Sequence, residues 1–433
     1  MSKKTRYLLI FFCFLVFVLL SPAIVIYVQG LSYDFQSGKF FKTGILAARV
    51  EPDTAEIWLD NTLKKEGEGN IKFLKPGEYN VKISKPGFFD WSKRLQIYPN
   101  EVTWINPANS KIYLFLKEPP IQTIAESVSD LQTFGQNIYA LKGQTLKTGT
   151  WQDGFKNSTD LNHSFTKILK AQDPFLILAG EKENLSNQFF LFDLNSKQIF
   201  DLSEFITTEK EAEQLIFKDN KIYSIQSLGL YEIDWQLKTK ILQIPNAKAA
   251  FFTNSDLYFL TQTATSTSLL VKNQISEEGT KLPLSLPQTA SAEIFVNNQK
   301  EVFLFLDQDL YKLADQPKIL EKNIGLFIAG KDNPNTIILL SSGELKFYDD
   351  TKKELKLVTR SSLKINNPVF RPTLDYLFLN KESSLYAIEL DNRDKQNEFL
   401  LYQALGDLKF FIDSEGKNAL VLDGTEVKKV KIR

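Results

Sequence analysis

The chain has 433 residues and carries 52 basic and 52 acidic side chains, so it is formally neutral. Neutrality argues against a nucleic-acid-binding protein, which normally presents a surplus of positive charge. One cysteine excludes an intrachain disulfide and a cysteine-rich metal site, and one histidine removes the commonest general base and metal ligand. We therefore expect no enzyme, no cofactor, no metal site and no catalytic residues.

The N-terminal residues predict a membrane anchor. Residues 1–6 form a short basic tail, and residues 7–28 are an apolar run without charge. As a helix this run would be roughly 33 Å long, enough for the ~30 Å hydrocarbon core of a bilayer. The alternative is a cleaved signal peptide, but the run is long for one and no A-x-A cleavage site follows. Because Lys3, Lys4 and Arg6 precede the run, we expect a cytoplasmic N-terminus and an exterior bulk.

A small β domain is predicted after the apolar run. Residues 29–43 form a polar linker, and apolar and polar residues alternate over residues 44–117. Alternation at strand length is typical of half-buried strands. The pair Pro76-Gly77 is a turn sequence, because proline fixes one central φ and glycine accepts a positive φ at the next position. We expect a small antiparallel β-sandwich.

Several motifs in this region follow one another in an order typical of one family. They are Thr43–Leu46, Glu51–Asp60, Leu74–Val81, Lys85–Phe88 and Trp91. In this order they resemble a PEGA domain, although the naming motif reads Pro52-Asp53-Thr54-Ala55 and Asp60-Asn61 replaces the usual Asp-Gly hairpin. The resemblance implies an extracytoplasmic β module of bacterial surface proteins, without catalytic residues.

Residues 118–433 contain an internal repeat of about forty residues. In six units an apolar strand begins and a second strand follows about eight residues later, while the units at 176 and 257 carry longer hairpins, the expected places for unique contacts. The eight units begin at positions 138, 176, 222, 257, 302, 337, 377 and 419. Such a period with all-strand content predicts a β-propeller of four-stranded blades. Eight blades fit best, seven fit if one unit is misread, and a pair of β-sandwiches is the alternative.

The last unit of the repeat lacks a fourth strand of its own. Residues 121–125 resemble the fourth strands of other units and precede the first unit. We expect this segment to pair with the last unit and close the ring, which would remove two open sheet edges. The whole looks like the bacterial membrane-anchored proteins in which a PEGA module precedes a propeller.

Three features that resemble chemical sites are better explained as structure. His163 lies in a polar stretch without the G-x-S-x-G turn of a serine hydrolase, so we expect a surface histidine. The segment Gly325–Asp332 nearly matches a phosphate loop, but Asp332 replaces the hydroxyl that ligates Mg²⁺. Acidic pairs occur at expected hairpin turns, where aspartate caps its own backbone. These pairs are Asp307 and Asp309, Asp349 and Asp350, and Asp391 and Asp394.

The leading hypothesis is a non-catalytic binding or scaffolding protein of the bacterial envelope, anchored in the membrane. Its expected partner is an envelope protein or cell-wall glycan, and neither nucleic acid nor nucleotide is expected. Two alternatives stay open. One is an envelope enzyme that acts on glycans through paired carboxylates in the propeller channel. The other is an assembly factor that binds exposed strands by edge addition.

Overall fold

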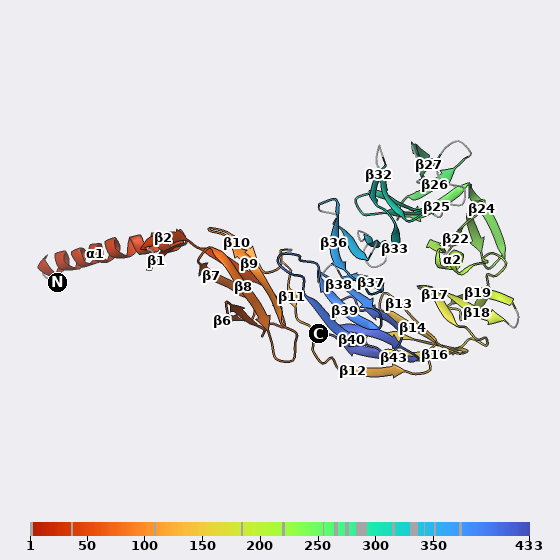
Figure 1. The fold of residues 1–433 in the computed structure, drawn as a ribbon, viewed down its shortest axis with the longest axis horizontal. Coiled ribbons are helices and arrows are strands. Elements are labelled where there is room, and N and C mark those ends of the chain that lie inside the picture. Colours follow the sequence, from red (N-terminus) through yellow and green to blue (C-terminus); the bar gives the residue numbers. More distant parts are fainter. Residues whose placement is uncertain are drawn as a thin grey trace.

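The computed structural model describes residues 3–35, 38–107, 110–182, 185–218, 221–253, 255–263, 267–272, 277–282, 292–313, 317–329, 337–341, 343–349, 352–371 and 375–433. Within these residues the fold is all-β apart from two helices, which confirms the predicted fold class at that level. The helices are α1 (Lys3–Val28) and α2 (Glu209–Glu213). Figure 1 shows α1 at one end of the molecule, a sandwich next to it, and a large group of small sheets beyond.

Helix α1 forms where the apolar run predicts a helix. Several of its apolar side chains are exposed, among them Phe11, Phe17 and Leu19. A spanning helix needs about 20 predominantly apolar residues. Among the residues that the structure describes, no helix meets the length and apolarity that a membrane crossing requires. The membrane span expected over residues 7–28 is therefore unsupported.

The region after α1 forms a short hairpin and then a sandwich with one buried core. The strands are β1 (Leu31–Asp34), β2 (Lys39–Lys42), β3 (Gly44–Ala48), β4 (Val50–Glu51), β5 (Glu56–Leu59), β6 (Thr62–Glu66), β7 (Gly69–Leu74), β8 (Gly77–Ser84), β9 (Trp91–Ile97), β10 (Val102–Trp104) and β11 (Ile112–Tyr113). Strands β1 and β2 pair with each other, and the two larger sheets have the orders β10-β3-β7 and β6-β5-β8-β9. Buried residues of both larger sheets, such as Leu46 and Val81, share one apolar cluster.

The sandwich is not purely antiparallel, which corrects the sequence prediction. Strand β10 pairs with β3 in parallel, and β11 pairs with β4 in parallel. The chain crosses from one sheet to the other between β9 and β10, and such a crossover permits a parallel pair. The β5–β6 hairpin is as expected. Its two turn residues, Asp60 and Asn61, have positive φ values of 47° and 63°, and a type I′ hairpin turn requires a positive φ at both positions.

Beyond the sandwich, the described residues form eight four-stranded antiparallel sheets, which we number in chain order. Sheet 1 consists of β13 (Asp130–Phe134), β14 (Asn137–Lys142), β15 (Thr145–Thr150) and β16 (Gly154–Asp160), and sheet 2 of β17 (Lys167–Gln172), β18 (Phe175–Lys182), β19 (Leu185–Asp193) and β20 (Ile199–Asp201). Sheet 3 consists of β21 (Ile216–Lys218), β22 (Lys221–Gln226), β23 (Gly229–Asp234) and β24 (Thr239–Pro245), and sheet 4 of β25 (Ala247–Phe252), β26 (Leu257–Gln262), β27 (Thr267–Lys272) and β28 (Glu277–Leu282). Sheet 5 consists of β29 (Ala292–Val296), β30 (Val302–Leu306), β31 (Asp309–Leu313) and β32 (Lys318–Glu321), and sheet 6 of β33 (Ile324–Ala329), β34 (Ile337–Ser341), β35 (Glu344–Asp349) and β36 (Glu354–Arg360). Sheet 7 consists of β37 (Ile365–Arg371), β38 (Tyr376–Lys381), β39 (Ser384–Glu389) and β40 (Glu398–Gln403), and sheet 8 of β12 (Ile121–Ala125), β41 (Leu408–Ile412), β42 (Asn418–Asp423) and β43 (Glu426–Lys431).

The repeat read from the sequence matches these sheets strand by strand. Each predicted unit start falls on the second strand of a sheet, from Ile138 in β14 to Ala419 in β42. Segment 121–125 forms β12, which pairs antiparallel with β43 as predicted. Parts of the two longer hairpins, residues 183–184 and 264–266, lie outside the described residues.

Buried apolar clusters join neighbouring sheets. They link sheets 1 and 2, 2 and 3, 4 and 5, 5 and 6, 6 and 7, and 7 and 8. Sheets 3 and 4 meet through the rings of Tyr223 and Phe252, whose centroids lie 4.8 Å apart. Sheet 8 also packs on sheet 1, where Val427 and Leu131 belong to the same cluster. Each of the eight sheets therefore contacts two others, and Figure 1 shows them grouped around a centre.

Helix α2 is an element that the sequence analysis did not expect. Thr208 accepts a hydrogen bond from the Glu211 backbone, and the Glu211 side chain accepts one from Thr208 in return. This reciprocal capping box satisfies donors at the start of a single helical turn. The T-x-x-E spacing was the available signal, but five residues are too few to show a helical period.

Candidate functional site

The structure places the histidine in an exposed bend and the described part of the phosphate-loop-like segment in a strand. His163 is exposed in the bend between β16 and β17, next to a turn in which the Asn162 amide donates to Asp160 at 2.9 Å. Residues 325–329 belong to strand β33, and residues 330–332 lie outside the described part of the chain. A strand presents no row of free amides to a phosphate, unlike the helix N-terminus of a phosphate loop.

The described members of all three acidic pairs lie at hairpin turns, as expected, with Asp391 and Asp394 in the connection between β39 and β40. Asp307 has a φ of 47° in the β30–β31 turn, and Asp309 begins β31. Asp349 accepts a hydrogen bond from the Lys352 amide at 3.1 Å, and Asp350 lies outside the described residues. Within the described residues, no group of three or more His, Cys, Asp or Glu side chains is arranged to hold a metal ion.

The third acidic pair lies where the sandwich meets sheet 7. Lys93 of β9 places its Nζ 3.2 Å from a carboxylate oxygen of Glu389 and 3.2 Å from one of Asp391. The side chains of Lys93, Glu389 and Asp391 are 0%, 2% and 5% exposed. Lys93 Nζ also donates to the Asp391 backbone carbonyl. We call these three residues the interdomain ion cluster.

Further hydrogen bonds surround the interdomain ion cluster. The Trp91 indole donates to one oxygen of Glu389 at 3.0 Å, and the Asn397 amide donates to the other at 2.8 Å. Arg393 donates to both carboxylate oxygens of Asp391 and to the backbone carbonyls of Trp104 and Ile105. Burying charge is costly unless each charged group is paired and hydrogen-bonded, and here each one is.

The two carboxylates of the cluster respond differently to burial. Burial raises the pKa of the Glu389 carboxyl above its usual range, against the opposing effects of Lys93, Asn397 and Trp91. Burial also acts to raise the pKa of Asp391, but hydrogen bonds from Arg393 and the charges of Lys93 and Arg393 outweigh it and lower that pKa. The cluster therefore contains an acid, Glu389, whose pKa is raised and whose side chain is 2% exposed.

An apolar core continues from the sandwich into sheets 7 and 8. The Phe115 ring packs edge-on against Tyr376 at 5.1 Å and lies 5.4 Å from Phe399. The Leu116 amide donates to the Ile432 carbonyl at 3.0 Å. Because one buried cluster spans the sandwich and both sheets, these parts form one packed body.

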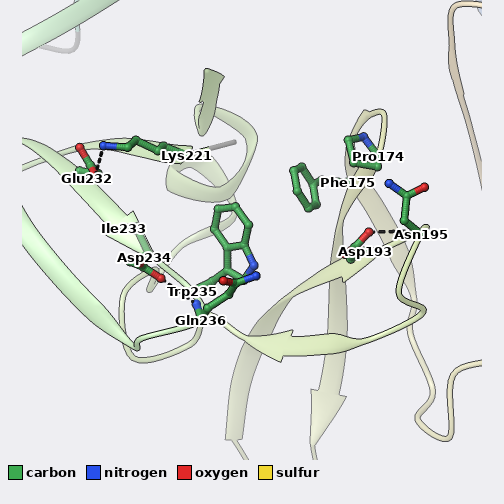
Figure 2. A pocket seen from close by; sticks show the side chains of 10 residues that line it. All are labelled: Pro174, Phe175, Asp193, Asn195, Lys221, Glu232, Ile233, Asp234, Trp235 and Gln236. Carbon is green, nitrogen blue, oxygen red and sulfur yellow. Dashed lines mark hydrogen bonds and ion pairs between the residues drawn. The ribbon is translucent and has the colours of Figure 1, made fainter. Parts of the chain in front are cut away.

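A separate pocket opens between sheets 2 and 3, with a cavity volume of about 420 Å³. Figure 2 shows the Trp235 indole standing between the turns of the two sheets, with Phe175 and Pro174 facing it from sheet 2. The rings of Phe175 and Trp235 meet edge-on at 5.1 Å. Polar side chains complete the lining: Asp193, Asn195, Lys221, Glu232, Asp234 and Gln236.

Two carboxylates of this pocket accept hydrogen bonds from backbone amides of their own turns. Asp193 accepts from the Asn195 amide at 2.9 Å, and Asp234 accepts from the Gln236 amide at 3.0 Å through Oδ1. Glu232 pairs with Lys221 at 2.7 Å. Trp235 is 8% exposed, and within the described part of the chain its indole N–H donates to no acceptor. This N–H is not among the buried side-chain polar atoms of the described residues that lack a hydrogen-bond partner, so it is an accessible donor at the pocket and is not sealed in the core.

Neither site was identified from the sequence. Lys93 and Glu389 are almost 300 residues apart, so no local motif links them. One signal was available: Lys93 occupies an inward position of β9, in phase with buried Trp91 and Leu95, where a lysine requires a partner. For the pocket, no such signal existed, because it arises only when the turns of two sheets come together.

Comparison with known proteins supports the sandwich assignment. The family model described as the PEGA domain matches residues 44–110. No curated protein matches the chain. Among solved structures, the chain is similar to PorZ, a surface component of the type-IX secretion system of Porphyromonas gingivalis, with 11% identity and a TM-score of 0.40 over 69% of this chain. The match spans only 42% of PorZ.

Two further structures are similar at the same level. AztD from Citrobacter koseri has 12% identity and a TM-score of 0.41, over 77% of this chain and 93% of AztD. Dipeptidyl peptidase 4 from Porphyromonas gingivalis has 10% identity and a TM-score of 0.45, over 69% of this chain and 56% of the peptidase. At TM-scores below 0.5, these likenesses carry no argument about activity.

Proposed function

We propose that this protein is a non-catalytic binding or scaffolding protein that works outside the cytoplasm. The observation that carries the proposal is the interdomain ion cluster, which fixes a PEGA module to a large array of sheets. A scaffold needs parts held in constant geometry, and a buried, fully hydrogen-bonded contact provides that. The match of residues 44–110 to the PEGA family supports a location outside the cytoplasm, where such domains typically occur.

The array of sheets is best interpreted as an eight-bladed propeller. Eight consecutive four-stranded sheets, each packed on two neighbours, are the pattern that a propeller requires. The pairing of β12 with β43 supports ring closure, because it joins the first and last segments of the array in one blade. A rigid ring with turns on both faces is suited to docking a partner.

The glycan-active enzyme receives no support from the buried carboxylates, because Asp391 of the third acidic pair has a lowered pKa and Glu389 beside it is inaccessible. A general acid needs a raised pKa and access to substrate. Glu389 has a raised pKa, but its side chain is 2% exposed and pairs with Lys93. Binding of an envelope protein or of cell-wall glycan, without turnover, is the function we propose.

Edge addition is a second candidate, favoured by strand β24. This outer strand of sheet 3 has Ile241 and Leu242 exposed at 53% and 40%. An exposed apolar edge offers unpaired backbone groups to an extended segment of another protein. Substitution Ile241→Lys should abolish capture of a partner that binds this way and leave glycan binding intact.

The proposed function is tested with the full-length chain extracted in detergent. Pull-down of envelope proteins is compared with co-sedimentation on purified cell-wall glycan, and release of reducing ends is followed in parallel. Specific capture of a protein or of glycan without new reducing ends supports the proposal. Release of reducing ends, or no capture in either arm, overturns it. Digestion of intact cells with an added protease tests the location, because a protein outside the cytoplasm is cleaved.

A further inference from the structure

The pocket between sheets 2 and 3 carries an excess of negative charge. Its lining contains three carboxylates, Asp193, Glu232 and Asp234, against the single ammonium group of Lys221. Because Lys221 pairs with Glu232 at 2.7 Å, the other two carboxylates of the lining have no ion-pair partner within the described residues and leave it with a net negative charge. An anionic ligand would therefore be repelled.

The unpaired indole of Trp235 argues against a simple organic cation. Trp235 is more than nine-tenths buried and lines the cavity, and its N–H stays accessible there without a protein acceptor among the described residues, so a ligand acceptor can receive its hydrogen bond. An ammonium group has donors and no acceptor. Such a ligand would satisfy the carboxylates and leave the indole N–H unpaired.

Asp234 retains capacity for a ligand donor, whereas both oxygens of Asp193 already accept hydrogen bonds, from the Asn195 amide and the Ser196 hydroxyl. Both turn amides that reach Asp234, from Gln236 and Leu237, bind its Oδ1, at 3.0 and 2.9 Å. Within the described residues no donor occupies Oδ2 of Asp234. A matching ligand must therefore donate to a carboxylate and accept from an indole, and a hydroxyl group does both.

We propose that this pocket binds a neutral carbohydrate. Its cavity of about 420 Å³ is adequate for one or two sugar rings, since small-ligand pockets measure roughly 300–1,000 Å³. Hydroxyl groups pair with Trp235 and Asp234, and the Phe175 side chain in the lining provides apolar surface for the sugar C–H groups. The inference rests on the proposed binding function and names its class of ligand.

The test is calorimetric titration of the full-length chain with two probes, N,N′-diacetylchitobiose and maltose. We expect at least one to bind, and Trp235→Phe to weaken that binding about tenfold, the effect of one lost hydrogen bond. Asp234→Asn should weaken it as well, while still capping the turn, so that it reports on the pocket even if Trp235→Phe unfolds. The matched control is Trp151→Phe, which follows β15 of sheet 1 as Trp235 follows β23 of sheet 3 and is 6% exposed.

Several results would overturn the inference. One is no binding of either disaccharide, and another is equal affinity in wild type, Trp235→Phe and Asp234→Asn. A third is that cadaverine, an organic diamine, binds and either competes with the disaccharide or binds where no disaccharide does. Failure of the carbohydrate inference can be distinguished from failure of the proposed function. A chain that captures an envelope protein but binds no sugar is still a scaffold, whereas a chain that cleaves glycan is not a non-catalytic scaffold.

Discussion

Lys93 is the buried cation of the contact that holds the sandwich to sheet 7. Lys93 neutralises two carboxylates that are almost inaccessible to water. Substitution Lys93→Met keeps the length of the side chain and leaves Glu389 and Asp391 buried with less compensation. We expect the free energy of unfolding to fall by about 3–5 kcal/mol, measured by urea denaturation.

The matched control for Lys93→Met lies on the neighbouring strand β8. Lys82 pairs with Asp90 at 3.0 Å, but both side chains are close to half exposed, at 47% and 44%. Exposed pairs contribute little, so Lys82→Met should cost less than about 1 kcal/mol. Equal losses in the two variants would contradict a special role for the buried cluster.

Glu389 makes the stability of the contact depend on pH. Its folded-state pKa is raised, by burial, above the ordinary value of 4.5. An acid of this kind contributes stability that is present below pH 4.5 and is lost as pH rises through the folded-state pKa. The free energy of unfolding of wild type minus that of Glu389→Gln should therefore decrease as pH rises from 4.5. Urea denaturation of both proteins in a pH series measures it, and a constant or rising difference would refute the assignment.

At the scale of the element, strand β12 is the one whose pairing joins distant parts of the sheet array. The Lys431 amide donates to the Pro120 carbonyl at 3.0 Å, which makes that pair a hydrogen-bonded one. Hydrogen-bonded pairs alternate along an antiparallel ladder, so the next is Gln122 with Lys429. Substitution Gln122→Pro removes a ladder donor, and we expect a loss of about 1–3 kcal/mol in urea denaturation.

The neighbouring position supplies the control for this strand. The Thr123 amide faces away from β43 by the same alternation, so Thr123→Pro adds the same ring constraint without removing a ladder bond. We expect it to cost less than half as much as Gln122→Pro. If both substitutions were equally harmless, β12 would contribute nothing to the stability of sheet 8.

The elements were predictable from the sequence to different degrees, for physical reasons. Ile138 and Ala419 begin strands at a regular period, and a repeated local pattern is readable without knowledge of long-range contacts. The parallel pairing of β10 with β3 was not, because alternation specifies which face is buried and not which strand lies beside it. The interdomain ion cluster was missed for a related reason: Asp391 and Asp394 have turn-like sequences, and their partners Lys93 and Arg94 lie in another domain.

At the scale of the whole molecule, the shared core implies that the sandwich and the sheets unfold together. Three of the five tryptophans, Trp58, Trp91 and Trp104, belong to the sandwich, and Trp151 and Trp235 belong to the sheets. In the double variant Trp151→Phe, Trp235→Phe, tryptophan fluorescence therefore reports on the sandwich and, through Trp91, on its contact with sheet 7. Far-UV circular dichroism of the same sample is dominated by the strands of sheets 1 to 8.

We expect the two signals of that variant to change at the same urea concentration. One apolar cluster and the interdomain ion cluster span the contact, so the sandwich cannot unfold without exposing the core of sheets 7 and 8. Coincident transitions are the mark of a single cooperative unit. Two separated midpoints would show instead that the PEGA module is stable by itself and that the buried contact does not couple it to the sheets. The rigid contact on which the proposed scaffold rests would then be refuted.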